Sequence, residues 1–194
     1  MAEDDIDAPA DPAPVDMAAF RGPLPADLRL KRTRSISLII AFLVFALDQG
    51  TKWVVAYPLQ LEFRHTIDIT DFFSLTYVRN NGVSLGLLSA DGDLGRWLLV
   101  ALTAAIAIFV VLWLWREKRR DDSTALAFVL GGALGNIADR TRLGYVLDFS
   151  DLHFGTWRPF LVFNVGDAAI TIGVLLLLVR ALLMRDGRAK KKDN

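Results

Sequence analysis

The sequence predicts an all-α integral membrane protein with four transmembrane helices and a small extracytoplasmic subdomain rich in β-structure. Hydrophobic residues make up 53% of the 194 residues, and they come in long blocks rather than on one face of each helix. A membrane-spanning helix needs about 20 apolar residues to cross about 30 Å of hydrocarbon. Every backbone group inside a bilayer needs an internal partner, so these blocks are expected to be helices.

Four apolar blocks meet or nearly meet this length. We expect spans over about residues 35–57, 94–115, 123–140 and 160–184, of which the third is short and polar at its far end. Together they form one membrane domain over residues 29–184, followed by a basic tail over 185–194. The first 28 residues hold seven acidic residues and no apolar core. They are therefore expected to form a disordered tail and not a signal peptide.

The basic residues predict the orientation of the spans. Five precede the first span, four lie between the second and third, and six lie at the end of the chain. Because cytoplasmic loops are enriched in Lys and Arg, both termini are expected in the cytoplasm. The outer loop over residues 58–93 contains two stretches with the alternation of short strands, 67–70 and 75–78, before a turn at 79–82.

Composition excludes several functions. The chain has no Cys and only two His residues, so neither a thiol nucleophile nor a metal site is expected, and no cofactor is predicted. Its formal net charge of zero gives no support for nucleic-acid binding. His65 and His153 are expected to be surface residues.

Polar residues in three of the spans are expected at similar depth. With a rise of about 1.5 Å per residue, the polar residues of the first, third and fourth spans all fall in the outer half of the membrane. Ionisable residues within a membrane are costly and are candidates for function. One shared site near the outer surface explains the whole set, which is Asp48, Lys52, Asn136, Asp139, Arg140, Asn164 and Asp167.

Two aspartates of this region could form a hydrolytic pair. Asp167 lies in an apolar helix, and Asp148 follows the third span in a stretch that could fold back toward it. Two carboxylates in a semi-dry site share a proton, so that one activates water while the other polarises a carbonyl. On spacing alone Asp151, expected to be solvated, is a rival to Asp148. Asp48 and Lys52, at i and i+4, could equally be a simple ion pair.

Four segments resemble the motifs of lipoprotein signal peptidase, also called signal peptidase II. The first two, Asp48–Lys52 and Asn80–Ser84, are short. The third runs over Gly131–Arg140 and continues at Val146–Phe149, and the fourth is Phe163–Ile170, with Gly166 where the family usually has Ala. The resemblance covers about residues 36–183 and is most specific in its last two segments.

The resemblance implies that Asp148 and Asp167 are the catalytic pair of an intramembrane aspartic peptidase. It implies that Asn136, Arg140 and Asn164 position substrate or support the pair. Further supporting residues would be Asp48, Lys52, Asn80, Gly82 and Asp139. The implied substrates are bacterial prolipoproteins, cut just before a Cys that carries a diacylglyceryl group. The implied location is the bacterial inner membrane, with the active site near its periplasmic face. Membrane lipids would be the other partners, and a monomer is expected.

Two other classes of function compete with a peptidase. A small transporter or proton channel would need polar groups through the whole depth of the membrane, whereas the inner halves of the four spans are apolar. A membrane anchor without catalytic activity would leave the clustered polar residues unexplained.

Overall fold

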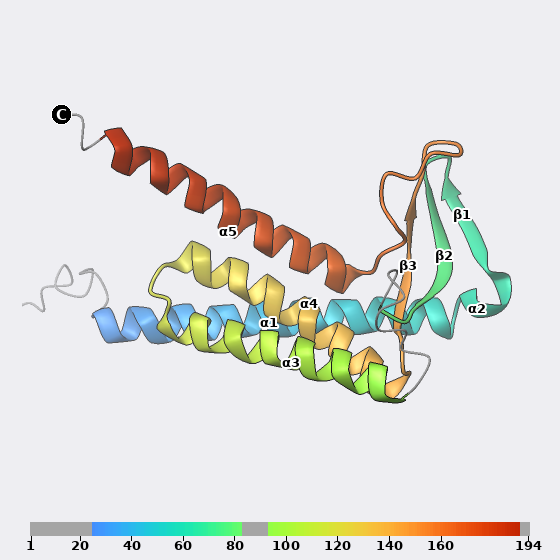
Figure 1. Cartoon of the computed structure of the whole chain (residues 1–194), viewed down its shortest axis with the longest axis horizontal. Coiled ribbons are helices and arrows are strands. Elements are labelled where there is room, and N and C mark those ends of the chain that lie inside the picture. Colours follow the sequence, from blue (N-terminus) through green and yellow to red (C-terminus); the bar gives the residue numbers. More distant parts are fainter. Residues whose placement is uncertain (1–24, 83–92, 191–194) are drawn as a thin grey trace, which may run out of the picture.

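The computed structural model describes residues 25–82 and 93–190 of the chain. The predicted acidic tail up to residue 24 and the motif residues Val83 and Ser84 lie outside these ranges. The described residues form five helices and three strands (Figure 1). The elements in order are α1 (Ala26–Ala56), α2 (Leu61–Arg64), β1 (Thr66–Thr70), β2 (Phe73–Asn80), α3 (Asp93–Arg116), α4 (Arg120–Arg142), β3 (Val146–Leu152) and α5 (Val165–Lys190).

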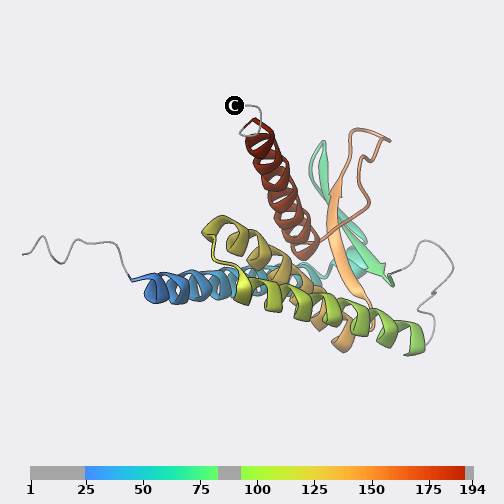
Figure 2. The ribbon, with the colours of Figure 1, turned by 60° about the vertical axis from the view of Figure 1, so that its left-hand side comes forward.

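Helix α4 is the centre of the helical bundle and contacts α1, α3 and α5. Its glycines allow two of these contacts to be close, because a Cβ atom on Gly132 would lie 2.3 Å from the carbonyl oxygen of Gly166 in α5. A Cβ on Gly131 would lie 2.5 Å from the carbonyl oxygen of Ala41 in α1. Small residues of this kind let helix backbones approach in a membrane. Helix α5 packs along α4 as far as Arg180, which pairs with Asp121 and Asp122, and it diverges from α1 and α3 (Figures 1 and 2).

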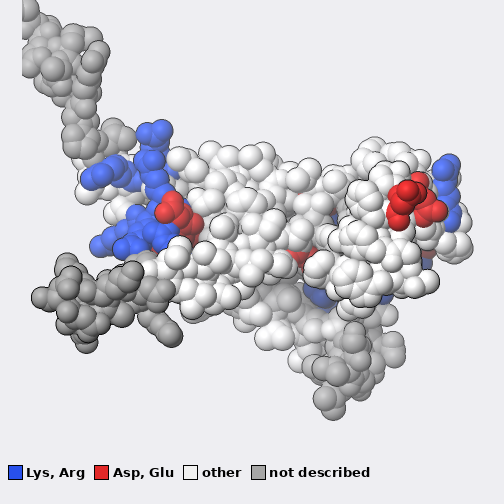
Figure 3. Space-filling view, turned by 90° about the horizontal axis from the view of Figure 1, so that it is seen from above, with Lys and Arg blue, Asp and Glu red and all other residues white. Residues whose placement is uncertain are grey.

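The surface of the bundle is that of a membrane protein. Among the described residues, helices α1, α3 and α5 are long and apolar enough to cross a membrane. Helix α4 does not meet this test, because charged residues occupy both of its ends, so its crossing stays a prediction. In Figure 3 the charged side chains gather at the two ends of the molecule, and the broad middle is almost free of them.

A three-stranded antiparallel sheet in the order β1-β2-β3 lies at one end of the bundle, which we call the sheet end. The predicted strands at 67–70 and 75–78 lie within β1 and β2, so the β-rich subdomain is confirmed. Strand β3 was not predicted, and with it the fold is mostly helical rather than all-α. Val55, Leu61, Leu147 and Phe149 form a buried apolar cluster that joins the sheet to the end of α1.

Several predicted boundaries differ from the structure. Helix α1 already begins at Ala26, and α5 continues to Lys190, into the predicted C-terminal tail. Helix α5 begins at Val165 rather than near residue 160. The physical reason is that the preceding chain is extended, since Phe163 pairs with Ser150 of β3 through two backbone hydrogen bonds. This pairing places the start of α5 directly beside β3.

Candidate active site

Asp167 is held by the first turn of α5. The side-chain oxygen of Asn164 accepts a hydrogen bond of 2.8 Å from the backbone N–H of Asp167. In return, the backbone N–H of Asn164 donates to Oδ2 of Asp167 at 3.3 Å. This reciprocal arrangement is a capping box, which satisfies two backbone N–H groups at a helix start. The sequence prediction placed both residues inside a helix; Asn164 instead precedes it and caps it.

Asp148 lies on β3 and is 1% exposed. Its Oδ2 accepts a hydrogen bond of 2.9 Å from Asn80 at the end of β2, and its Oδ1 accepts one of 2.6 Å from Asn164. Burial raises the pKa of Asp148 to about 6, and the nearby charge of Asp167 also raises it, while the two asparagine hydrogen bonds lower it. A carboxyl group whose pKa lies near neutrality can exchange protons at physiological pH.

Asn164 links the two aspartates. Its Nδ2 donates to Asp148, while its backbone and Oδ1 contact Asp167. From α4, Asn136 donates to Oδ1 of Asp167 at 2.8 Å and accepts from Asn164 at 3.2 Å. The structure therefore brings together Asn80, Asn136, Asp148, Asn164 and Asp167, although they come from four separate segments.

The side chain of Arg140 lies beside this group. Its Nε atom is buried, and within residues 25–82 and 93–190 it has no hydrogen-bond partner. A Cβ atom on Gly82 would lie 3.7 Å from its Nη2 atom, and φ of Gly82 is +93°. Gly82 thus lies next to the guanidinium, although a Cβ there would meet Leu99 first, at 2.5 Å. The N–H of Gly82 donates to Oδ1 of Asn80 at 2.9 Å. A buried guanidinium nitrogen that lacks a partner is available to a bound ligand.

Behind the aspartates lies a buried ionic cluster. Nζ of Lys52 contacts both Asp48 and Asp139 at 2.8 Å, and it also donates to Oδ1 of Asn136 at 3.3 Å. The Asp48–Lys52 ion pair is thus present, but it is buried and connected to the site rather than isolated near a helix end. Gln49, which the prediction omitted, donates to Asp48 at 3.1 Å and to Asp139 at 2.9 Å. Its place three residues before Lys52 on α1 was the available signal.

Asp151 does not join the site. It is 2% exposed, so the expectation that it is solvated was wrong. Its carboxylate accepts hydrogen bonds from Arg158 and from Thr76, on the sheet. His65 is exposed, whereas His153 is partly buried and bonded to Ser74 at 2.8 Å. Within the described residues, no three His, Cys, Asp or Glu side chains are grouped to hold a metal ion.

Two cavities flank the aspartates. One, of about 310 Å³, is apolar and lined by Asp167 together with Phe160, Leu161, Phe163, Ala168, Thr171 and Ile172. The other, of about 500 Å³, is lined by Asp148 together with Leu161, Val162 and the residues from Val78 to Gly82. Leu161 belongs to both cavities and is 84% exposed. Asp167 and Asp148 therefore line different cavities, and Leu161, in the extended segment before α5, borders both.

The fold and the site define a membrane protein whose polar site lies at one end of an otherwise apolar helical bundle. A sequence model of the family described as signal peptidase (SPase) II matches residues 40–183. The chain therefore belongs to the signal peptidase II family of peptidases, and the resemblance found in the sequence is confirmed.

Individual relatives agree with this assignment. The chain is 59% identical over 160 residues to a lipoprotein signal peptidase of Rhizorhabdus wittichii, covering 82% of this chain and 93% of the relative. It is 54% identical to one of Sphingopyxis alaskensis, over 81% of this chain and 92% of that one. A bacterial membrane enzyme solved by the in meso method at 1.9 Å is similar in fold, with a TM-score of 0.67, 30% identity, and coverage of 76% of this chain and 93% of that chain.

Proposed function

We propose that this protein is an aspartic endopeptidase that removes signal peptides from diacylglyceryl-modified bacterial prolipoproteins by cutting before the lipidated Cys. The observation that carries the proposal is the link through Asn164, which contacts both Asp148 and Asp167. Paired carboxylates hydrolyse peptides without a covalent intermediate. The family and the names of the relatives support the choice of substrate.

The two aspartates take different roles in this mechanism. We assign the shared proton to Asp148, because burial raises its pKa to about 6, close enough to neutrality for a protonated fraction to be present. Asp167 is the general base that takes a proton from the attacking water, while Asp148 donates its proton to the carbonyl oxygen of the scissile bond. The tetrahedral intermediate then collapses: the C–N bond breaks and the proton held by Asp167 passes to the leaving amine. Asp148 takes a proton back from a hydroxyl of the intermediate, so both aspartates return to their starting states.

The neighbouring residues hold this arrangement. Asn80, Asn136 and Asn164 each donate a hydrogen bond to one of the carboxylates and so fix its orientation. Arg140, with no internal partner for Nε, binds a carbonyl oxygen of the substrate next to Gly82. Such pre-positioned donors stabilise charge that develops in the transition state. Asp48, Lys52 and Asp139 form the buried ionic cluster, in which Lys52 also donates to Asn136 and so helps to hold it in place.

The two cavities suit a substrate that is partly lipid and partly peptide. The apolar cavity at Asp167 follows the first turns of α5 and accommodates apolar groups of the substrate. The cavity at Asp148 is bounded by β2 and leads toward the sheet end. We place this end at the periplasmic face of the inner membrane and both termini in the cytoplasm, following the basic residues. One chain supplies both aspartates, so a monomer is sufficient.

A transporter or a proton channel is less well supported. The polar side chains that hydrogen-bond to one another around the aspartates lie at the sheet end. Helix α3 consists almost entirely of apolar residues between Trp97 and Trp115. A conducting path would need polar groups along the length of the bundle.

The proposal is tested with purified protein in lipid and a prolipoprotein precursor with or without its diacylglyceryl group. We expect cleavage of the modified precursor only, and a product whose first residue by mass spectrometry is the lipidated Cys. A product cut at another bond, or equal cleavage of the unmodified precursor, would contradict this function.

A further inference from the structure

Asp48 and Asp139 make the same kind of contact, each with the residue that directly precedes one of the two catalytic candidates. Oδ1 of Asp48 accepts a hydrogen bond of 2.8 Å from the backbone N–H of Gly166, the residue directly before Asp167. Oδ2 of Asp139 accepts one of 3.1 Å from the backbone N–H of Leu147, which directly precedes Asp148. Each catalytic candidate therefore follows a backbone group that a buried carboxylate holds in place.

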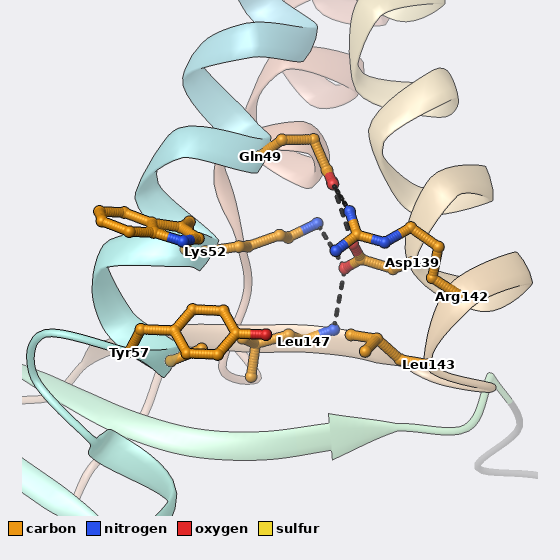
Figure 4. A pocket seen from close by; sticks show the side chains of 9 residues that line it. Gln49, Lys52, Tyr57, Asp139, Arg142, Leu143 and Leu147 are labelled. Atoms are coloured by element: carbon orange, nitrogen blue, oxygen red, sulfur yellow. Dashed lines mark hydrogen bonds and ion pairs between the residues drawn. The ribbon is translucent and has the colours of Figure 1, made fainter.

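Lys52 joins these two carboxylates. Its Nζ atom lies 2.8 Å from Asp48 and 2.8 Å from Asp139, and its side chain is 5% exposed. Figure 4 shows Lys52 and Gln49 reaching from α1 toward Asp139, which contacts the backbone of Leu147. Gln49 connects the same two carboxylates, but as a neutral group and at 2.9 to 3.1 Å. Both side chains donate to carboxylates, but only the ammonium carries a positive charge that offsets the repulsion between the two carboxylates, so the ammonium is the main link.

We propose that Lys52 is a positioning residue that fixes the separation of Asp148 and Asp167 by tying together the two carboxylates that hold the backbone before each of them. The inference rests on the proposed function, since it concerns the same aspartates. Strand β3 and helix α5 are separate elements, which the pairing of Phe163 with Ser150 brings side by side at the backbone. At the side-chain level, Lys52 of α1 contacts the carboxylates next to both elements, so one cation fixes their positions relative to each other.

The same ammonium also orients an amide at the site. Oδ1 of Asn136 accepts from Lys52 and from Asn164, which leaves Nδ2 of Asn136 to donate to Asp167. If this amide were reversed, its carbonyl oxygen would face the carboxylate of Asp167. Lys52 therefore acts on Asp167 through two routes, the backbone of Gly166 and the side chain of Asn136.

The test compares Lys52→Met with Lys118→Met, the same change at an exposed lysine between α3 and α4. Steady-state cleavage of a diacylglyceryl-modified precursor is measured per folded enzyme. A displacement of about 1 Å at reacting groups lowers rates by about 10²-fold. We expect Lys52→Met to lower kcat by about that factor with KM within about threefold, Lys118→Met to match the wild type, and Lys52→Arg to recover part of kcat.

Lys52→Met alone leaves two buried carboxylates without their cation, which can unfold the protein. The double variant Lys52→Met with Asp139→Asn removes one carboxylate together with the cation. It keeps the net charge of the cluster unchanged, and the amide oxygen of the new side chain can still accept from Leu147. We expect the same loss of kcat. Normal kcat per folded enzyme in either variant, or a loss confined to KM, would overturn the proposal. Failure of the wild type to cut the precursor would instead contradict the proposed function and leave these ratios unmeasurable.

Discussion

Helices α3 and α4 have similar lengths, 24 and 23 residues, but most side chains of α3 are exposed and many of those of α4 are buried. Helix α3 packs against α4 and exposes most of its large apolar side chains, among them Leu102, Ile106 and Ile108. Helix α4 buries twelve residues and carries Asn136, Asp139 and Arg140 at its sheet end. Of these two helices, the one with the weaker membrane signal is therefore the one that contributes to the site.

This difference has a physical reason. A helix that faces lipid needs only apolar side chains, because lipid tails are as apolar as those side chains. A helix surrounded by α1, α3 and α5 is shielded from lipid, so it can hold polar groups that are bonded internally. The close contacts of Gly131 and Gly132 provide that shielding.

The largest effect is expected at the crossing of α4 with α5. Gly132→Val places side-chain atoms against the carbonyl oxygen of Gly166, which already lies 2.3 Å from a Cβ position. We expect a loss of roughly 3 kcal/mol or more of stability, measured as a drop in Tm in detergent. Gly50→Ala is the control, because nothing lies within 4 Å of its Cβ position, and it should be neutral or slightly stabilising. Equal Tm for the two variants would contradict close packing at Gly132.

A somewhat smaller effect is expected from the polar face of α4. Asn136→Leu removes the hydrogen bond to Asp167 and the acceptor for Lys52. We expect roughly a 10²-fold loss of kcat/KM for precursor cleavage, since the carboxylate is no longer oriented. Leu134→Ala, at a 40% exposed position of the same helix, should change it little. If both variants cut at wild-type rates, α4 would not contribute to the site.

The burial of Asp148 predicts a dependence of stability on pH. Its folded-state pKa of about 6 lies above the ordinary value of 3.8. For a carboxyl group with a raised pKa, stability is fully present below about pH 4 and falls as pH rises through 6. We expect Asp148→Asn to be more stable than the wild type at pH 8, by at most about 3 kcal/mol, with no gain at pH 4. Melting curves at both pH values check this, and a gain that is larger at pH 4 would contradict it.

The smallest effect is expected on α3. Ile108 is 61% exposed, and Ile108→Ala leaves an apolar surface toward lipid. Stability should change by less than about 0.5 kcal/mol and cleavage should not change. Loss of activity in this variant would show that α3 has a role beyond packing, and the contrast with α4 would fail.

Much of this structure could be predicted from the sequence, for reasons that the helices illustrate. Long apolar blocks identify α1, α3 and α5, because lipid imposes a composition on any helix that faces it. Strand β3 was missed, since Val146–Leu152 is buried on both sides and has no alternating pattern. The start of α5 was misplaced because a tertiary contact, the pairing of Phe163 with Ser150, determines it.

The residues of the site were predictable as a set, but their connections were not. Spacing and motif order grouped the polar residues, yet the role of Asn164 as a helix cap depends on where α5 begins. Gln49 was missed because nothing in its own residue type indicates that it contacts Asp139, which is 90 residues away in the chain. Asp151 could not be separated from Asp148 by spacing; their hydrogen-bond partners separate them.

The central claim is that Asp148 and Asp167, and no third carboxylate, hydrolyse the precursor. The most direct measurement is the cleavage rate of a diacylglyceryl-modified precursor by Asp148→Asn, Asp167→Asn and Asp151→Asn, each shown to be folded. Asp151 is a matched control, because it is equally buried on the same strand. We predict no detectable cleavage by the first two variants and substantial cleavage by the third. Cleavage by either of the first two at a rate near that of the wild type would contradict the claim.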